Sequence, residues 1–157
     1  LLLTSASVLL LVGLGVADYT ELKFKTCKSK FEVKSVSISD CEKIEEDGSG
    51  GCIFSVGSSP SLRVKFVPNE SGVDELITTV KAKYGKTLLP YNLEDDEACK
   101  HSGLACPLEE GKEYTYEQSV TISPSYPKDN IFHIMWMIGR DPKSPDVCIV
   151  FLGKINS

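Results

Sequence analysis

Apolar and polar residues alternate along most of the chain after residue 17. In residues 62–66, for example, Leu, Val and Phe alternate with Arg and Lys. A period of two places every second side chain on the same face of a strand, so this pattern predicts strands with one buried face. The alternating or apolar segments are residues 22–24, 33–38, 62–66, 76–84, 114–122 and 149–152.

Gly, Pro, Asn, Asp and Ser cluster between these segments, as is typical of turns. No window combines a helical stripe of apolar residues with helix-capping residues, and the chain has no internal repeat or linker. Seven or eight short strands in about 140 residues predict an all-β sandwich. The turn clusters are residues 47–51, 58–60, 68–72, 123–124 and 141–145.

Residues 131–138 break the alternation, because they are apolar on both faces apart from His133. One interpretation is a central strand that is covered on both sides. The other is an exposed apolar patch that contains Met135 and Met137 and binds a partner or a second copy. The sequence alone leaves both interpretations open.

Residues 1–17 carry no charge, and twelve of the seventeen are Leu, Val or Ala. They end in Gly15-Val16-Ala17, with small residues at the −3 and −1 positions, before the polar Asp18. This is the pattern of a secretory signal peptide, here without its basic start. The run is short for a membrane span. We therefore expect a mature, secreted domain at residues 18–157.

The composition is that of one globular domain of 157 residues with 41% hydrophobic side chains. A net charge of −5 argues against a nucleic-acid-binding protein, which would carry an excess of basic residues. The most informative number is the six cysteines, which are Cys27, Cys41, Cys52, Cys99, Cys106 and Cys148. In a secreted chain an even set of this kind predicts three disulfides.

Fifteen pairings of six cysteines are possible in principle. Proximity along the chain suggests Cys41 with Cys52 and Cys99 with Cys106, which leaves Cys27 to close on Cys148. The spacings do not resemble a zinc site, since there is no Cys-x-x-Cys. We expect no metal site.

The sequence offers little support for catalysis. Neither His101 nor His133 belongs to a nucleophile motif, and the acidic run at residues 94–97 lacks the spacing of a calcium loop. We expect neither an enzyme nor a cofactor. Asn69-Glu70-Ser71 matches the N-glycosylation sequon at a predicted turn, so we expect a glycan at Asn69.

Large side chains with inward parity are numerous in the predicted strands. They can fill the core of a sandwich, or they can line a cavity for an apolar ligand, and parity does not distinguish the two. The aromatic members are Phe66, Tyr84, Tyr91, Tyr114, Tyr116, Trp136 and Phe151.

The cysteines and their neighbours resemble the ML lipid-recognition family, which includes the small Niemann–Pick type C sterol-transfer protein and the group 2 mite allergens. The resemblance covers the whole mature chain. It is carried by Phe24-Lys25-Thr26-Cys27, Cys99-Lys100-His101-Ser102-Gly103, Cys106-Pro107-Leu108, residues 111–116, Ser125-Tyr126-Pro127 and the strand of Trp136. It implies an immunoglobulin-like two-sheet β-sandwich with the disulfide pairing suggested above.

The resemblance also implies an apolar tunnel between the sheets that holds one lipid. By position, one wall would contain Val64 and Phe66, and the mouth would contain Tyr91. Tyr91 stands where the sterol-transfer branch usually has Phe, so both a sterol and a fatty acid remain open as ligands. The implied lipid-binding residues are Val64, Phe66, Val80, Tyr91, Ile122, Tyr126, Pro127, Ile134 and Trp136.

Two functions are therefore consistent with the sequence. The first is a secreted or lysosomal carrier of a sterol, fatty acid or related lipid, which delivers its ligand to a membrane or a receptor. The second is an extracellular interaction protein, such as an immune modulator, receptor ligand or inhibitor, that acts through its surface without a lipid.

Overall fold

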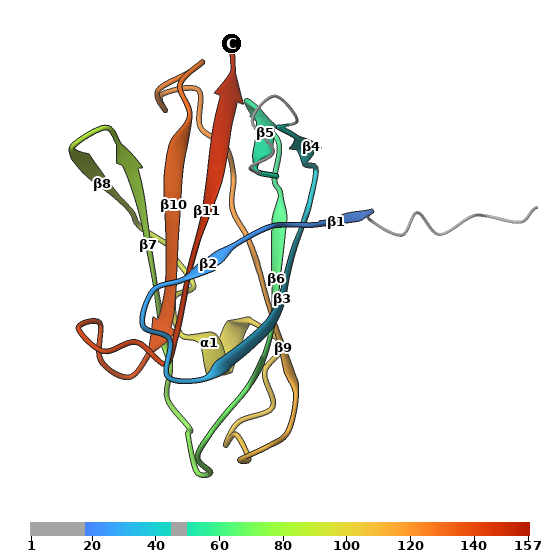
Figure 1. Cartoon of the computed structure of the whole chain (residues 1–157), viewed down its shortest axis with the longest axis vertical. Helices are drawn as coiled ribbons and strands as arrows, with labels where there is room; N and C mark the ends of the chain where they lie inside the picture. Colours follow the sequence, from blue (N-terminus) through green and yellow to red (C-terminus); the bar gives the residue numbers. More distant parts are fainter. Residues whose placement is uncertain (1–17, 45–49) are drawn as a thin grey trace, which may run out of the picture.

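The fold is known from a computed structural model that describes residues 18–44 and 50–157. The expected signal peptide, residues 1–17, and residues 45–49 lie outside the described residues. Two β-sheets pack face to face, with a single helical turn at one end (Figure 1). The prediction of an all-β, two-sheet sandwich is confirmed.

The smaller sheet has four antiparallel strands in the order β1-β3-β6-β9. These strands are β1 (Tyr19–Glu21), β3 (Glu32–Ser39), β6 (Ser61–Val67) and β9 (Tyr114–Ser119). In β6 the three predicted apolar positions, Leu62, Val64 and Phe66, are all buried. The alternation in the sequence therefore reports the inner face of this sheet correctly.

The larger sheet has seven strands, and its main path runs β4-β5-β11-β10-β7-β8, with β2 also paired to β11. All of its pairs are antiparallel except β5 with β11, which is parallel. Its strands are β2 (Lys25–Thr26), β4 (Glu42–Lys43), β5 (Cys52–Ser55), β7 (Ile77–Tyr84), β8 (Thr87–Tyr91), β10 (Phe132–Gly139) and β11 (Val147–Asn156).

The strands that the pattern did not predict are short or irregular. Strands β2 and β4 have two residues each, which is too few to show alternation, and β8 contains the unbroken apolar run Leu88-Leu89-Pro90. Conversely, the predicted strand 114–122 ends at Ser119. Beyond it, Val120 and Ile122 bond instead to the loop at 58–60. The one described helix, α1 (Ala98–His101), is a single turn.

Strand β10 bears on the two interpretations of residues 131–138. It lies between β11 and β7, and Met137 stands opposite Cys148 and Thr79 on the outer face. Met137 is only 7% exposed, and Met135 is half-buried. Strand β10 is therefore a central strand, but its outer face is only partly covered: Met137 is buried, Met135 is half-buried and His133 is exposed.

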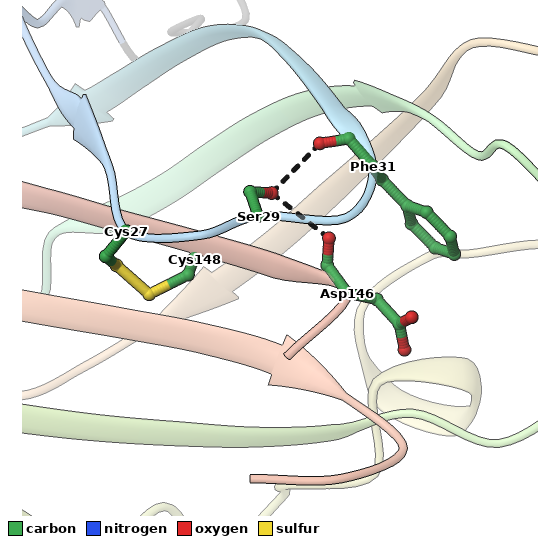
Figure 2. The surroundings of a disulfide bond; sticks show 5 residues. All are labelled: Cys27, Ser29, Phe31, Asp146 and Cys148. Carbon is green, nitrogen blue, oxygen red and sulfur yellow. Dashed lines mark hydrogen bonds between the residues drawn. A yellow bond between two sulfur atoms is a disulfide. The ribbon is translucent and has the colours of Figure 1, made fainter. Parts of the chain in front are cut away.

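The three disulfides are those that proximity along the chain suggested: Cys27–Cys148, Cys41–Cys52 and Cys99–Cys106. Figure 2 shows how the first joins the N-terminal segment to β11. Close to it, Ser29 Oγ donates to the carbonyl oxygens of Phe31 at 2.9 Å and of Asp146 at 3.1 Å. The covalent bridge and these hydrogen bonds together hold residues 27–31 against the start of β11.

The core between the sheets has two parts. In one part, the ring of Phe66 stacks on Phe31 and on Tyr114, with centroids 6.0 and 6.1 Å apart. All three rings are buried, so this closed half is filled with side chains. The other half contains the cavity described below. Within residues 18–44 and 50–157, no helix is long and apolar enough to cross a membrane.

Candidate functional site

An apolar cavity of about 270 Å³ lies between the sheets, at the end opposite the closed half. Its walls come from the inward faces of β7, β8, β10 and β11, from Ile38 and Phe54, and from the segment 120–127. No Asp, Glu, Lys, Arg or His side chain of the described residues lines it. An apolar, uncharged interior of this kind suits a ligand that water solvates poorly.

The edge hairpin β7–β8 forms one side of the cavity. Among the described strands, β8 pairs with β7 alone, and its register places Tyr91 opposite Val80 and Leu89 opposite Ala82. Directly opposite residues share a face of the sheet, so all four side chains point toward the cavity. All four line it.

Three tyrosines, Tyr84, Tyr91 and Tyr126, line the cavity and are half-buried, so they mark the side on which it opens to solvent. The rings of Tyr91 and Tyr126 meet edge to face with centroids 6.0 Å apart, and Tyr84 stacks on Phe132 at 4.6 Å. Burial raises the pKa of Tyr126 to about 12, with smaller contributions from the neighbouring Tyr91 and Tyr84 hydroxyls. Burial also raises the pKa of Tyr84. At neutral pH, Tyr126 and Tyr84 therefore carry neutral hydroxyls that can donate or accept a hydrogen bond.

A buried polar cluster marks the inner end of the cavity. The indole Nε1 of Trp136 donates to the hydroxyl of Tyr116 at 3.2 Å, and Thr78 Oγ1 lies 3.0 Å from the same hydroxyl. Burial raises the pKa of Tyr116 to about 12. Trp136 lines the cavity and Tyr116 does not, so the three polar groups satisfy one another beside the apolar space.

Seven of the nine predicted lipid-binding residues lie in the cavity wall: Val80, Tyr91, Ile122, Tyr126, Pro127, Ile134 and Trp136. Val64 and Phe66 do not. In the smaller sheet Ile38 pairs with Leu62, and the next inward row contains Val36, Val64 and Tyr116. Because the cavity reaches Ile38 but not that next row, Val64 and Phe66 belong to the closed half.

The sequence prediction omitted several wall residues that the fold brings in. Tyr84 and Phe151 had the inward parity of the aromatic set but were not assigned to the site. Phe54 lies on β5 and Leu89 on β8, and neither short strand was predicted. Inward parity could have signalled Ala82, because it shares a face with Val80 in the predicted strand.

The candidate chemical groups lie away from the cavity. His101 is half-exposed near the Cys99–Cys106 bridge, with Nε2 3.9 Å from Asp95, and His133 faces outward on β10. In the described part of the chain, no three His, Cys, Asp or Glu residues come together in a way that could hold a metal ion. The sequon residue Asn69 is exposed, and its Nδ2 donates to the carbonyl oxygen of Lys30 at 3.1 Å.

Comparisons with known proteins agree with this geometry. The sequence profile of the ML domain matches residues 21–154. A Caenorhabditis elegans protein named heh-1 is 33% identical over 149 residues, which cover 94% of this chain and 96% of that protein. The Drosophila melanogaster NPC intracellular cholesterol transporter 2 homolog a is 29% identical over 140 residues, covering 86% and 88%.

A solved structure has the same architecture. The crystal structure of a Niemann-Pick type C2 protein from the Japanese carpenter ant superposes with a TM-score of 0.73 at 26% sequence identity. The match covers 86% of this chain and all of the ant chain. The profile match, the fold and the apolar cavity lead to one conclusion: the chain belongs to the ML domain family.

Proposed function

We propose that this protein is a secreted carrier that holds one sterol, fatty acid or related lipid in the cavity between its sheets. Members of the ML domain family are lipid-binding or lipid-transfer proteins and not enzymes. The observation that carries the proposal is the cavity itself, which is apolar, uncharged and edged by tyrosines. Two of the similar proteins are named as a cholesterol transporter homologue and a Niemann-Pick type C2 protein.

Binding would be driven by burial of the lipid. Each Å² of apolar surface removed from water contributes about 25 cal/mol. The polar groups of Tyr116, Trp136 and Thr78 are already bonded to one another, so an apolar tail beside them leaves no polar atom newly unpaired. A single hydroxyl or carboxyl of the ligand would bond to the tyrosine hydroxyls at the opening.

The surface around the opening favours transfer of the ligand. Leu88, Leu89 and Ile131 are large apolar residues that are 48%, 39% and 49% exposed. Leu89 lines the cavity, and with Ile131 it borders a shallow hollow beside the opening. Apolar surface at this place would favour contact with a membrane or with the apolar surface of a receptor during delivery.

We infer delivery to the extracellular space or the lysosomal lumen. Residues 1–17 have the pattern of a secretory signal peptide, and three disulfides suit an oxidising compartment. The sequon at Asn69 would be glycosylated on that route, and its exposed side chain is accessible to the transferase.

Native mass spectrometry of the protein purified from a secreting host tests the proposal. We expect the mass of the protein plus one lipid, which added cholesterol or oleic acid displaces and solvent extraction releases. Binding can be followed in parallel by the fluorescence of Trp136, the single tryptophan, which lines the cavity. A bare protein that stays bare with every lipid class offered would overturn the proposal and favour a protein that acts through its surface.

A further inference from the structure

A second hollow, of about 360 Å³, lies on the outer face of the larger sheet, away from the lipid cavity. One wall is the segment Lys23-Phe24-Lys25, which runs into β2 beside β11 (Figure 1). The other wall is formed by His133 on β10 and by Val150, Phe151 and Leu152 on β11. We call this hollow the outer groove.

The strand register separates the outer groove from the cavity. His133 on β10 pairs with Leu152 on β11. Along each strand, successive side chains point to opposite faces of the sheet. Ile134 and Trp136 therefore point into the cavity, whereas His133 and Leu152 point outward. The two sites share the same strands and one lining residue, Phe151, whose buried side chain lies on the cavity face of the sheet.

The outer groove and its surroundings are basic, although the chain as a whole has a net charge of −5. Lys25 stands opposite Val150, and Lys83 on β7 stands opposite His133. Lys81 occupies the next outward position on β7. Among the described residues, none of these three lysines forms a salt bridge, and no acidic residue lines the groove.

The groove is also apolar between its basic ends. Val150 and Leu152 are half-buried on β11, and Phe24 packs partly against the core. The floor therefore offers apolar side chains, while Lys25 and His133 offer N–H donors on opposite sides. A fully polar anion would make no contact with the apolar floor, and a neutral lipid would place no negative charge beside Lys25.

We propose that the outer groove binds one anionic amphiphile, a molecule with a single phosphate or carboxylate head and an apolar chain. The head lies between Lys25 and His133, with Lys83 adding to the positive potential, and the chain lies along Phe24, Val150 and Leu152. The groove is recessed and has the volume of a small-molecule site, which suits one free molecule better than the flat surface of a bilayer.

Titration of the ¹⁵N-labelled protein with dodecyl phosphate, followed by NMR, tests this proposal. Below the concentration at which the probe forms micelles, we expect saturable shifts of the backbone amides of residues 23–25, 133, 150 and 152; Phe151 is left out because it also lines the cavity. Neutral dodecyl maltoside should not shift them. The readout is separate from the cavity, because binding there moves the fluorescence of Trp136 and amides such as Tyr91 and Ile122.

The variants Lys25→Gln and His133→Gln should each weaken dodecyl phosphate binding at the groove about fivefold, the effect expected from loss of one exposed charge or donor. The matched control is Lys65→Gln, which removes a lysine from the outer face of the smaller sheet and should leave the affinity unchanged.

Three outcomes would overturn the proposal: shifts confined to the cavity residues, equal shifts with dodecyl maltoside, or the same affinity in Lys25→Gln, His133→Gln and Lys65→Gln. Vesicles of phosphatidylcholine with phosphatidylserine provide a further arm. Binding to these vesicles without binding to monomeric dodecyl phosphate would replace the single-molecule site with a membrane-docking face.

Discussion

The hydroxyl of Tyr116 on β9 accepts a hydrogen bond from the indole Nε1 of Trp136 on β10 at 3.2 Å, which joins the two sheets inside the core. Thr78 Oγ1, on β7, lies 3.0 Å from the same hydroxyl. One phenol oxygen therefore satisfies polar groups on two strands of the opposite sheet. The cavity ends beside this cluster, so the cluster divides the hollow half of the sandwich from the filled half.

Replacement of that hydroxyl should be costly. In Tyr116→Phe, the buried Trp136 N–H and Thr78 hydroxyl lose their partner, and we expect the free energy of unfolding to fall by about 1–3 kcal/mol. Urea denaturation measures this difference. The control is Tyr19→Phe, which removes an exposed hydrogen bond to Glu117 and should change stability far less. Equal stability of both variants would show that the cluster contributes nothing to folding.

The same tyrosine makes stability depend on alkaline pH. Burial raises the pKa of Tyr116 from 10 to about 12 in the folded protein. The folded state therefore holds this proton more tightly than the unfolded state, so the contribution is complete below pH 10 and is lost as the pH rises through 12. A shift of this size corresponds to a loss of about 2–3 kcal/mol.

Urea denaturation at pH 9 and pH 11.5 measures this loss. Tyr116→Phe has no group to ionise at this position, so its stability should fall less between the two pH values than that of the wild-type protein. The tyrosinate absorbance of the wild-type protein should in turn show at least one phenol that ionises late. Identical pH dependence of the two proteins would contradict the assignment.

Directly after β10, a buried carboxylate pairs with a partly exposed guanidinium. Arg140 bonds to both carboxylate oxygens of Asp146, at 3.1 and 2.7 Å, and also contacts Glu70. The side chain of Asp146 is only 1% exposed, so Arg140→Ala would leave a buried carboxylate without its counter-charge. Because the guanidinium itself is partly exposed, we expect a loss of about 2–3 kcal/mol in unfolding free energy.

Thermal and urea denaturation check this value, with Lys143→Ala in the same loop as the control. The lysine is exposed and forms no salt bridge among the described residues, so its removal should cost almost nothing. If Arg140→Ala and Lys143→Ala have the same unfolding free energy, the Arg140–Asp146 pair does not contribute to stability.

The disulfides should differ in their contributions. Cys27 and Cys148 are 121 residues apart in sequence, whereas Cys41 and Cys52 are 11 apart. If the bridges act mainly by restricting the unfolded chain, the longer loop contributes about 5 kcal/mol and the shorter about 3 kcal/mol. Replacement of each pair by alanine, followed by denaturation, should therefore rank Cys27–Cys148 first. The reverse order would point to effects in the native state.

The sequence predicted more of the fold than of the candidate site. Alternation in residues 62–66 and 76–84 identifies inward faces because a strand has a fixed period of two. This period shows which side chains point inward, but it does not show which part of the core each side chain reaches. Val64 and Val80 both point inward, yet one lies in the closed half and the other in the cavity wall.

Whether an inward side chain lies in the closed half or in the cavity wall depends on how side chains from distant parts of the chain pack around it. The rings of Phe31 and Tyr114 both stack on Phe66, and no local sequence pattern encodes these contacts. Similarly, Phe54 and Leu89 reach the cavity from short strands that show no alternation. The resemblance to the ML family supplied seven of the wall residues, and the packing of the core brought in the others.

Because the core has a hollow half and a filled half, one variant in each half can test where a lipid binds. Val80→Phe adds a ring inside the cavity, and a clash of about 1.4 kcal/mol or more with a bound lipid corresponds to about a tenfold or greater loss of affinity. Displacement of a fluorescent sterol or fatty acid measures this loss, and circular dichroism confirms that the variant is folded.

The complementary variant is Phe66→Ala, which removes a ring from the closed half. We expect its unfolding free energy to fall by about 3–5 kcal/mol, because the change creates a cavity among Phe31 and Tyr114. Its lipid affinity should stay near that of the wild-type protein, since Phe66 does not line the cavity. Normal binding by Val80→Phe together with lost binding by folded Phe66→Ala would place the lipid in the half of the core that we describe as filled.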